Sequence, residues 1–207
     1  IDNLDQMILL RRFKWMERVK AKLIYTEEED NLYGIVGEHY GYCRLPGNLT
    51  HRRGLWSLNN GIYIVVDKII QEQNIPHKIV LQWLLGPWDI NLKDKNNWQE
   101  IIQDVPCGKY SLYLNIFNEQ MDIVKEKDLS VVKGREGENP RGWVSRYYGE
   151  RNAVNSVELG VNTEKPVFFI SIFAPSELGL NFSLENSELI INFEQKLRKI
   201  NLDRYFS

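Results

Sequence analysis

The sequence predicts an all-β fold, built as an antiparallel β-sandwich or as stacked antiparallel sheets. Apolar and polar residues alternate with a period of two along much of the chain, which is typical of strands with one buried face. Turn-forming residues interrupt these runs at short intervals, and helical patterns do not alternate with them. Parallel strands need long crossover connections, usually helical, so the pattern favours antiparallel sheets over a parallel α/β fold.

The clearest alternating runs give the expected strands in chain order. They are Val19–Thr26, Leu32–Tyr40, Leu49–Leu58, Ile62–Ile69, His77–Leu85, Tyr110–Phe117 and Val167–Phe173. Between the third and fourth runs, Asn60 and Gly61 tolerate the positive φ of a tight hairpin turn. This hairpin places His51 and Val65 on neighbouring antiparallel strands. Ser187–Arg198 is expected to form a final hairpin strand, so that the sheet extends close to the end of the sequence.

Three segments need a separate interpretation. Asp2–Lys20 contains good helix formers with imperfect helical spacing, so a helix remains open there. The acidic run Glu27–Asp30 could hold a cation, but it lacks the alternating ligands and the glycine of a calcium loop, which favours a solvated hairpin tip. Glu136–Gly142 is expected to be one longer loop.

Composition limits the possible partners. The 207 residues are 43% hydrophobic and 26% charged, with a net charge of -2, so nothing in the charge favours binding to nucleic acid. The longest apolar stretch, Val167–Pro175, is too short to span a membrane. We expect one β-sheet domain over residues 1–207. Because the sequence begins with Ile1, we expect its native start to be missing, as in a fragment of a longer protein.

Few residues suggest catalytic chemistry. The three histidines, His39, His51 and His77, show no metal-ligand spacing, and Cys43 and Cys107 are expected to be small buried side chains or free thiols. The sequence contains no Gly-x-Ser-x-Gly elbow, phosphate loop or dinucleotide-binding glycine motif. Any acid pair for glycoside hydrolysis would be an arbitrary choice among 28 acidic residues.

The triplet His51-Arg52-Arg53 is not one constellation, because His51 and Arg53 point to one face of a strand and Arg52 to the other. Two interpretations of His51 stay open: a hydrogen-bonded strand histidine near the edge of the core, or a base or carboxylate binder beside Arg53. His39, with Tyr40 and Tyr42 nearby, allows the same two interpretations. Five tryptophans could stack on sugars, but a buried core is the better expectation for them. They are Trp56, Trp83, Trp88, Trp98 and Trp143.

Several stretches, taken in order, resemble a known family. They are Ile1–Gln6, Arg11–Leu23, Gly41–Tyr42 with Thr50–Arg53, Tyr63–Lys68, Gly142–Ser145 with Tyr148–Gly149, and Phe168–Pro175. Over residues 1–175 the chain resembles the later part of the C-terminal domain of heparinase II/III-like polysaccharide lyases. The resemblance implies a bacterial protein in which stacked antiparallel sheets follow an α/α toroid. Such a protein cleaves uronate-containing polysaccharides, such as glycosaminoglycans or alginate, by β-elimination and is usually exported to the periplasm or beyond.

The family's catalytic and metal-binding motifs lie upstream of the matching region. A tyrosine and an asparagine or histidine of the toroid act with a histidine from a Gly-His-x-His-x-Asp motif, and a structural divalent metal such as zinc can be present. This chain lacks that motif, so we expect no catalytic residue and no metal ligand in it. The residues that could still bind substrate are His39, Tyr42, His51 and Arg53. The expected partners are the toroid and an acidic polysaccharide. The alternatives are a separate acidic-carbohydrate-binding module and a structural β-sandwich.

Overall fold

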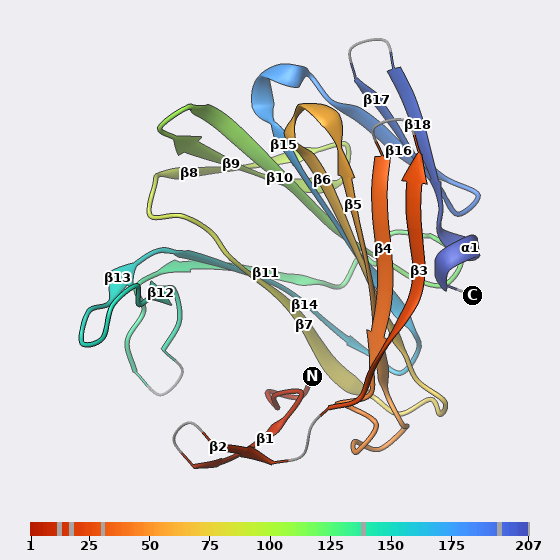
Figure 1. Cartoon of the computed structure of the whole chain (residues 1–207), viewed down its shortest axis with the longest axis vertical. Coiled ribbons are helices and arrows are strands. Elements are labelled where there is room, and N and C mark those ends of the chain that lie inside the picture. The colour runs from red at the N-terminus through yellow and green to blue at the C-terminus, as the bar shows by residue number, and fades with distance from the viewer. Residues whose placement is uncertain (12–13, 17–18, 30–31, 138–139, 194–195, 207) are drawn as a thin grey trace.

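The computed structural model describes residues 1–11, 14–16, 19–29, 32–137, 140–193 and 196–206 (Figure 1). Most of these residues belong to antiparallel strands in stacked sheets, and few are helical, which confirms the predicted fold class. No helix among them is long and apolar enough to cross a membrane.

An eight-stranded sheet forms the centre of the molecule, and each of its strands is antiparallel to its neighbours. In spatial order its strands are β3 (Ala21–Glu29), β4 (Leu32–His39), β5 (Thr50–Leu58), β6 (Ile62–Ile70), β15 (Val167–Pro175), β10 (Gly108–Phe117), β9 (Trp98–Val105) and β8 (Ile90–Lys95). The short turn η1 (Asn59–Gly61) joins β5 to β6, with φ values of 68° at Asn60 and 75° at Gly61. The predicted hairpin at this position is therefore confirmed.

Two smaller sheets cover opposite faces of the central sheet (Figure 1). One consists of β11 (Asp128–Lys133), β14 (Asn155–Thr163) and β7 (His77–Leu84). The other consists of β16 (Asn181–Glu185), β17 (Glu188–Phe193) and β18 (Lys196–Asn201), followed by helix α1 (Leu202–Phe206). The remaining elements are β1 (Ile8–Arg11), β2 (Lys14–Met16), β12 (Trp143–Val144), β13 (Asn152–Ala153) and the turn η2 (Ser176–Leu178).

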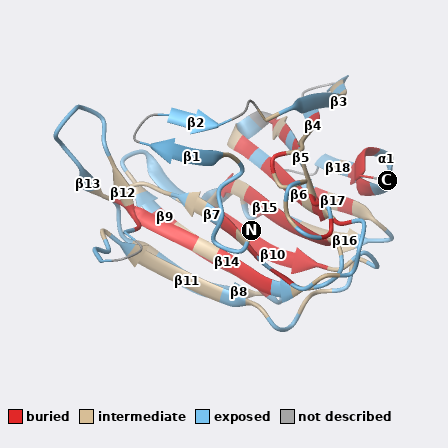
Figure 2. Ribbon diagram, turned by 90° about the horizontal axis from the view of Figure 1, so that it is seen from below, coloured by how far each residue is buried: buried red, intermediate tan, exposed pale blue. Residues whose placement is uncertain are grey.

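The three layers enclose two separate hydrophobic cores. Because side chains alternate between the faces of a strand, Ile170 of β15 packs in the core beside β17, whereas its neighbour Phe169 packs in the core beside β14. Figure 2 shows the buried residues concentrated in the central strands. The β11–β14–β7 sheet, which packs on the Phe169 face of the central sheet, does not reach β3. Leu23, Ile35 and Leu55 therefore lie exposed on that same face.

The prediction of a possible helix over residues 2–20 is wrong, because Ile8–Arg11 and Lys14–Met16 of this segment pair as the β1–β2 hairpin. Ile8, Leu9 and Leu10 follow one another directly, so a helix could not gather them into one apolar stripe. In the hairpin all three are exposed, and Figure 2 shows both strands at the surface. Residues 12–13 and 17–18 lie outside the described residues.

Two of the expected loops need comment. The acidic run does end strand β3 of the β3–β4 hairpin, but Glu27 is not solvated: its side chain is 8% exposed and accepts a hydrogen bond from Tyr205 at 2.7 Å. Asp30 lies outside the described residues. The segment Glu136–Gly142 is a loop closed by paired backbone hydrogen bonds between Arg135 and Arg141, at 2.8 and 3.0 Å. Residues 138–139 are not described. The expected strand Ser187–Arg198 is divided into β17 and β18.

Candidate functional site

The four residues predicted to bind substrate lie close together: His39 on β4, His51 and Arg53 on β5, and Tyr42 in the turn that follows β4. Strand pairing sets His39 directly opposite His51, and Arg53 opposite Asp67. Arg52 points to the other face, where it donates hydrogen bonds to Glu38 at 3.0 Å and to the carbonyl of Tyr205 at 3.3 Å. The expected separation of Arg52 from its two neighbours is therefore confirmed.

A chain of hydrogen bonds, which we call the histidine array, runs through His39, His51 and Asp67. The backbone N–H of Gly41 donates to His39 Nδ1 at 3.3 Å, so the His39 proton resides on Nε2. His39 Nε2 donates to His51 Nδ1 at 2.9 Å, and His51 Nε2 donates to Asp67 Oδ1 at 2.6 Å. Each ring therefore carries one proton, and each ring nitrogen already has a partner.

The electrostatic environment matches this arrangement. Burial lowers the pKa of His39 to about 4, and the neighbouring His51 and Arg53 act in the same direction, so this ring is neutral at pH 7. Burial alone would raise the pKa of Asp67, but the hydrogen bonds from His51 and Arg53 outweigh it and hold that pKa below its ordinary value. The array therefore runs from the neutral ring of His39 to the buried carboxylate of Asp67.

Arg53 and Tyr42 flank the array. Arg53 donates two hydrogen bonds to Asp67, from Nε to Oδ1 at 2.5 Å and from Nη2 to Oδ2 at 3.1 Å. Its Cζ lies 5.5 Å from the ring centroid of Trp83. The side chain of Arg53 is still 44% exposed. The ring of Tyr42 lies 5.7 Å from that of His39, measured between centroids. Of this group, Arg53 offers the most accessible charge to a ligand.

Asp67 is the member of this group that we did not predict as a site residue. It is 2% exposed and sits among apolar residues in Ile62–Ile70. A carboxylate in the middle of such a strand requires a buried partner, and that requirement could have revealed it.

The histidine array is poorly suited to proton abstraction. A general base needs a free lone pair within reach of the proton that it removes, and both rings have theirs engaged by Gly41 and His39. Two cavities adjoin the array. The smaller one, beside His51, Arg53 and Asp67, has a volume of about 140 Å³, below the ~300 Å³ at which small-molecule pockets begin. The larger one has a volume of about 560 Å³ and is lined by His39, His51 and Arg53 together with exposed apolar side chains such as Leu23 and Leu55. The geometry favours a hydrogen-bonded strand histidine at position 51. Substrate binding by the four residues stays a prediction.

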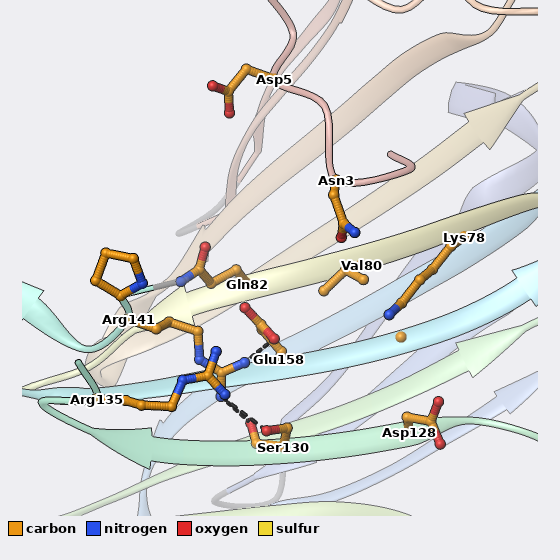
Figure 3. Close-up of a pocket in the computed structure, with 12 residues that line it drawn as sticks. Asn3, Asp5, Lys78, Val80, Gln82, Asp128, Ser130, Arg135, Arg141 and Glu158 are labelled. Carbon is orange, nitrogen blue, oxygen red and sulfur yellow. Dashed lines mark hydrogen bonds and ion pairs between the residues drawn. The ribbon is translucent and has the colours of Figure 1, made fainter. Parts of the chain in front are cut away.

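A second polar site, which we call the outer hollow, lies on the surface of the β11–β14–β7 sheet that faces away from the core (Figure 3). It has a volume of about 670 Å³. Its floor contains side chains from all three strands, and its rim comes from the start of the chain and from Arg135, Pro140 and Arg141. The floor includes Lys78, Gln82, Asp128, Ser130 and Glu158, and the rim includes Asn3, Asp5, Arg135 and Arg141.

Arg141 anchors the outer hollow. Its guanidinium pairs with Glu158 and donates from Nη2 to Ser130 Oγ at 3.0 Å, although the residue is only 7% exposed. Burial, and the nearby charge of Arg135, lower its pKa from the ordinary arginine value. The sequence did not predict Arg141, Glu158 and Ser130 as site residues, because the strands β11 and β14, which bring them together, were not expected.

The fold and both sites define a class of protein: a domain of stacked antiparallel sheets with a histidine–aspartate array on one face of its central sheet and a polar hollow on an outer sheet. The family model described as "Heparinase II/III-like, C-terminal" matches residues 1–192, so the chain belongs to this family. No curated protein matches the sequence.

Solved structures show the same fold. A heparinase III structure is similar with a TM-score of 0.61 and 16% sequence identity, over 87% of this chain and 27% of that one. The heparan sulfate lyase HepC from Pedobacter heparinus is similar with a TM-score of 0.63 and 16% identity, over 88% of this chain and 28% of that one. The chain thus spans about a quarter of the length of these structures.

Proposed function

We propose that this chain is the C-terminal β-sheet part of a polysaccharide lyase that cleaves uronate-containing polysaccharides by β-elimination. The observation that carries the proposal is the family match over residues 1–192. The share of the heparinase chains that it covers, 27–28%, supports a larger parent protein with an α/α toroid ahead of this region. The exposed apolar side chains of Leu23, Ile35 and Leu55 give such a neighbouring part a surface to pack on.

Within this proposal the chain is a scaffold. β-Elimination requires a base that removes the C5 proton of the uronate and a group that neutralises the adjacent carboxylate. His39 and His51 have no free ring nitrogen to serve as that base, so the toroid and the strands upstream would supply it. The described residues hold no group of three or more His, Cys, Asp or Glu side chains placed to bind a metal ion, so a structural zinc would take its ligands from elsewhere.

The test is to express the complete polypeptide that its gene encodes and to incubate it with heparan sulfate, alginate and other uronans. Ultraviolet absorbance of the unsaturated product should rise with at least one of them. His39→Gln should keep kcat within a few-fold of the unsubstituted protein, because the array does not transfer the proton. Glycosidic hydrolysis without an unsaturated product would contradict the proposal, as would cleavage by the 207-residue chain alone.

The exposure of the tryptophans separates the scaffold from a carbohydrate-binding module. A module would present coplanar exposed tryptophans, whereas Trp56 is 0% and Trp98 5% exposed and both lie in the core beside β17. Trp15 is 45% and Trp88 39% exposed, on different segments of the chain, and Trp83 and Trp143 are intermediate. This distribution favours the scaffold. We also propose export to the periplasm or the exterior of a bacterium, where such polysaccharides are available.

A further inference from the structure

Residues 134–137 and 140–154, which we call the arm, project from the end of β11 and return to β14, carrying β12 and β13. Figure 1 shows its loops on the side of the β11–β14–β7 sheet that also faces the start of the chain. The arm contains Gly142–Ser145 and Tyr148–Gly149, the stretches of the family resemblance that the scaffold role leaves unexplained.

The base of the arm is firmly held. The carbonyl of Gly142 accepts hydrogen bonds from Gly134 at 3.1 Å and from Val154 at 2.8 Å, which ties the two ends of the arm together. Trp143 donates its indole N–H to the carbonyl of Arg135 at 3.0 Å. The guanidinium of Arg151 stacks over Trp143 with its Cζ 4.2 Å from the ring centroid. A tip mounted on this base is presented in a defined position.

The tip of the arm exposes two adjacent tyrosines. Tyr147 is 71% and Tyr148 104% exposed. Both belong to a turn over residues 147–150, in which the N–H of Glu150 donates to the Tyr147 carbonyl at 3.2 Å. Large aromatic side chains are costly to leave in water, so their display on a fixed turn marks an interaction surface.

Charged side chains of both signs surround the tyrosines. Residues 134–154 contain four arginines and three glutamates in the sequence. Glu136 is engaged by Arg151, and outside the arm Glu158 is engaged by Arg141. Arg146, directly before the tyrosines, and Glu150, two residues after them, form no ion pair with any residue that the structure describes. The tip therefore combines aromatic rings with an available positive charge.

The outer hollow adjoins the base of the arm. Arg135 and Arg141 belong to the arm and also line the hollow, opposite Asn3 and Lys78 (Figure 3). The volume of about 670 Å³ falls in the ~300–1,000 Å³ range of ligand sites. Amide, hydroxyl and charged groups alternate along its floor, and they offer both donors and acceptors to a ligand rich in hydroxyl groups.

We propose that the arm and the outer hollow together bind an acidic oligosaccharide. Tyr147 and Tyr148 stack against sugar rings, Arg146 pairs with a carboxylate or sulfate, and the hollow at the base of the arm receives other sugar units of the same oligosaccharide. This inference rests on the proposed function for the acidic character of the ligand, and it assigns this chain a substrate-contacting role beyond that of a scaffold.

Binding to the 207-residue chain tests the proposal without any need for catalysis. Heparan sulfate and alginate oligosaccharides serve as probes, with dextran oligosaccharides of matched length as the neutral control. The double variant Tyr147→Ala/Tyr148→Ala should lose about tenfold or more in affinity, and Arg146→Ala should weaken binding and reduce its salt dependence. Two matched controls, Tyr33→Ala/Tyr63→Ala on the central sheet and Lys165→Ala in another exposed loop, should bind like the unsubstituted chain.

The outcomes separate this proposal from the proposed function. Failure of the chain to bind either acidic probe, equal binding of dextran, or an unchanged affinity of the tyrosine double variant would overturn the arm proposal. Thermal unfolding of each variant shows whether the fold is kept, which the exposure of Tyr147 and Tyr148 leads us to expect. Arm-dependent binding combined with no lyase activity of the complete protein would overturn the proposed function alone.

Discussion

At the scale of single residues, most of the histidine array follows from strand alternation. Alternation separates Arg52 from His51 and Arg53, and the Asn60–Gly61 turn brings β6 alongside. Alternation does not determine the register of the strands. A shift of β4 by two residues along β5 would leave every side chain on the same face but would separate His39 from His51. The direct hydrogen bond between the rings could therefore only be seen in the structure.

The array makes stability depend on pH. His39 has a folded pKa of about 4, below its ordinary value of 6.5, so the folded state favours the neutral ring. Its contribution is complete above pH 6.5 and is lost progressively as the pH falls toward 4. We expect the free energy of unfolding in urea to decrease across this interval. His39→Gln, which keeps a donor and an acceptor, should flatten the decrease, and an identical pH profile for both proteins would show that His39 is not the source.

The buried carboxylate of Asp67 should be expensive to remove. Asp67→Asn deprives Arg53 of its ion-pair partner and leaves the His51 N–H facing an amide, so we expect a loss of about 3–5 kcal/mol in the free energy of unfolding. Asp104→Asn is the matched control, because Asp104 pairs with Lys109 at the surface and should cost less than about 1 kcal/mol. Equal losses in the two variants, measured by chemical denaturation, would contradict a structural role for the array.

At the scale of elements, the strands with the strongest alternation were predicted and the weaker ones were missed. Strand β8, Ile90–Lys95, is largely exposed and reads as a polar segment. Strand β14 does alternate, but Gly160 and its asparagines reduce its strand propensity. The outer hollow was unpredictable for this reason, since its floor requires β11 and β14 beside β7.

The arm depends on a glycine at its base. Gly142 has a φ of 79°, and a Cβ atom there would lie 2.7 Å from the carbonyl oxygen of Val154, so Gly142→Ala introduces both backbone strain and a clash. Gly149→Ala is the control, because Gly149 has a φ of 81° with open space around it. We expect Gly142→Ala to lower the free energy of unfolding by about 1–3 kcal/mol more than Gly149→Ala.

Limited proteolysis completes the comparison at the arm. Cleavage within residues 134–154 should become faster in Gly142→Ala than in Gly149→Ala, because the first substitution loosens the base and the second affects only the tip. If both variants were cleaved alike, the base would not hold the arm in the way that its hydrogen bonds indicate.

At the scale of the whole molecule, the central sheet belongs to both hydrophobic cores, so they cannot unfold independently. Phe169 and Ile170 are neighbours on β15 but face opposite cores, and each is at most 1% exposed. We expect Phe169→Ala to cost about 3–5 and Ile170→Ala about 2–5 kcal/mol, from lost burial and the cavities left behind. Both variants should still unfold in one transition that far-ultraviolet circular dichroism and tryptophan fluorescence report at the same denaturant concentration. Trp98 reports on the core that contains Ile170, and Trp83 packs against the core that contains Phe169, so separate transitions for one variant would mean that a covering sheet is an independent folding unit.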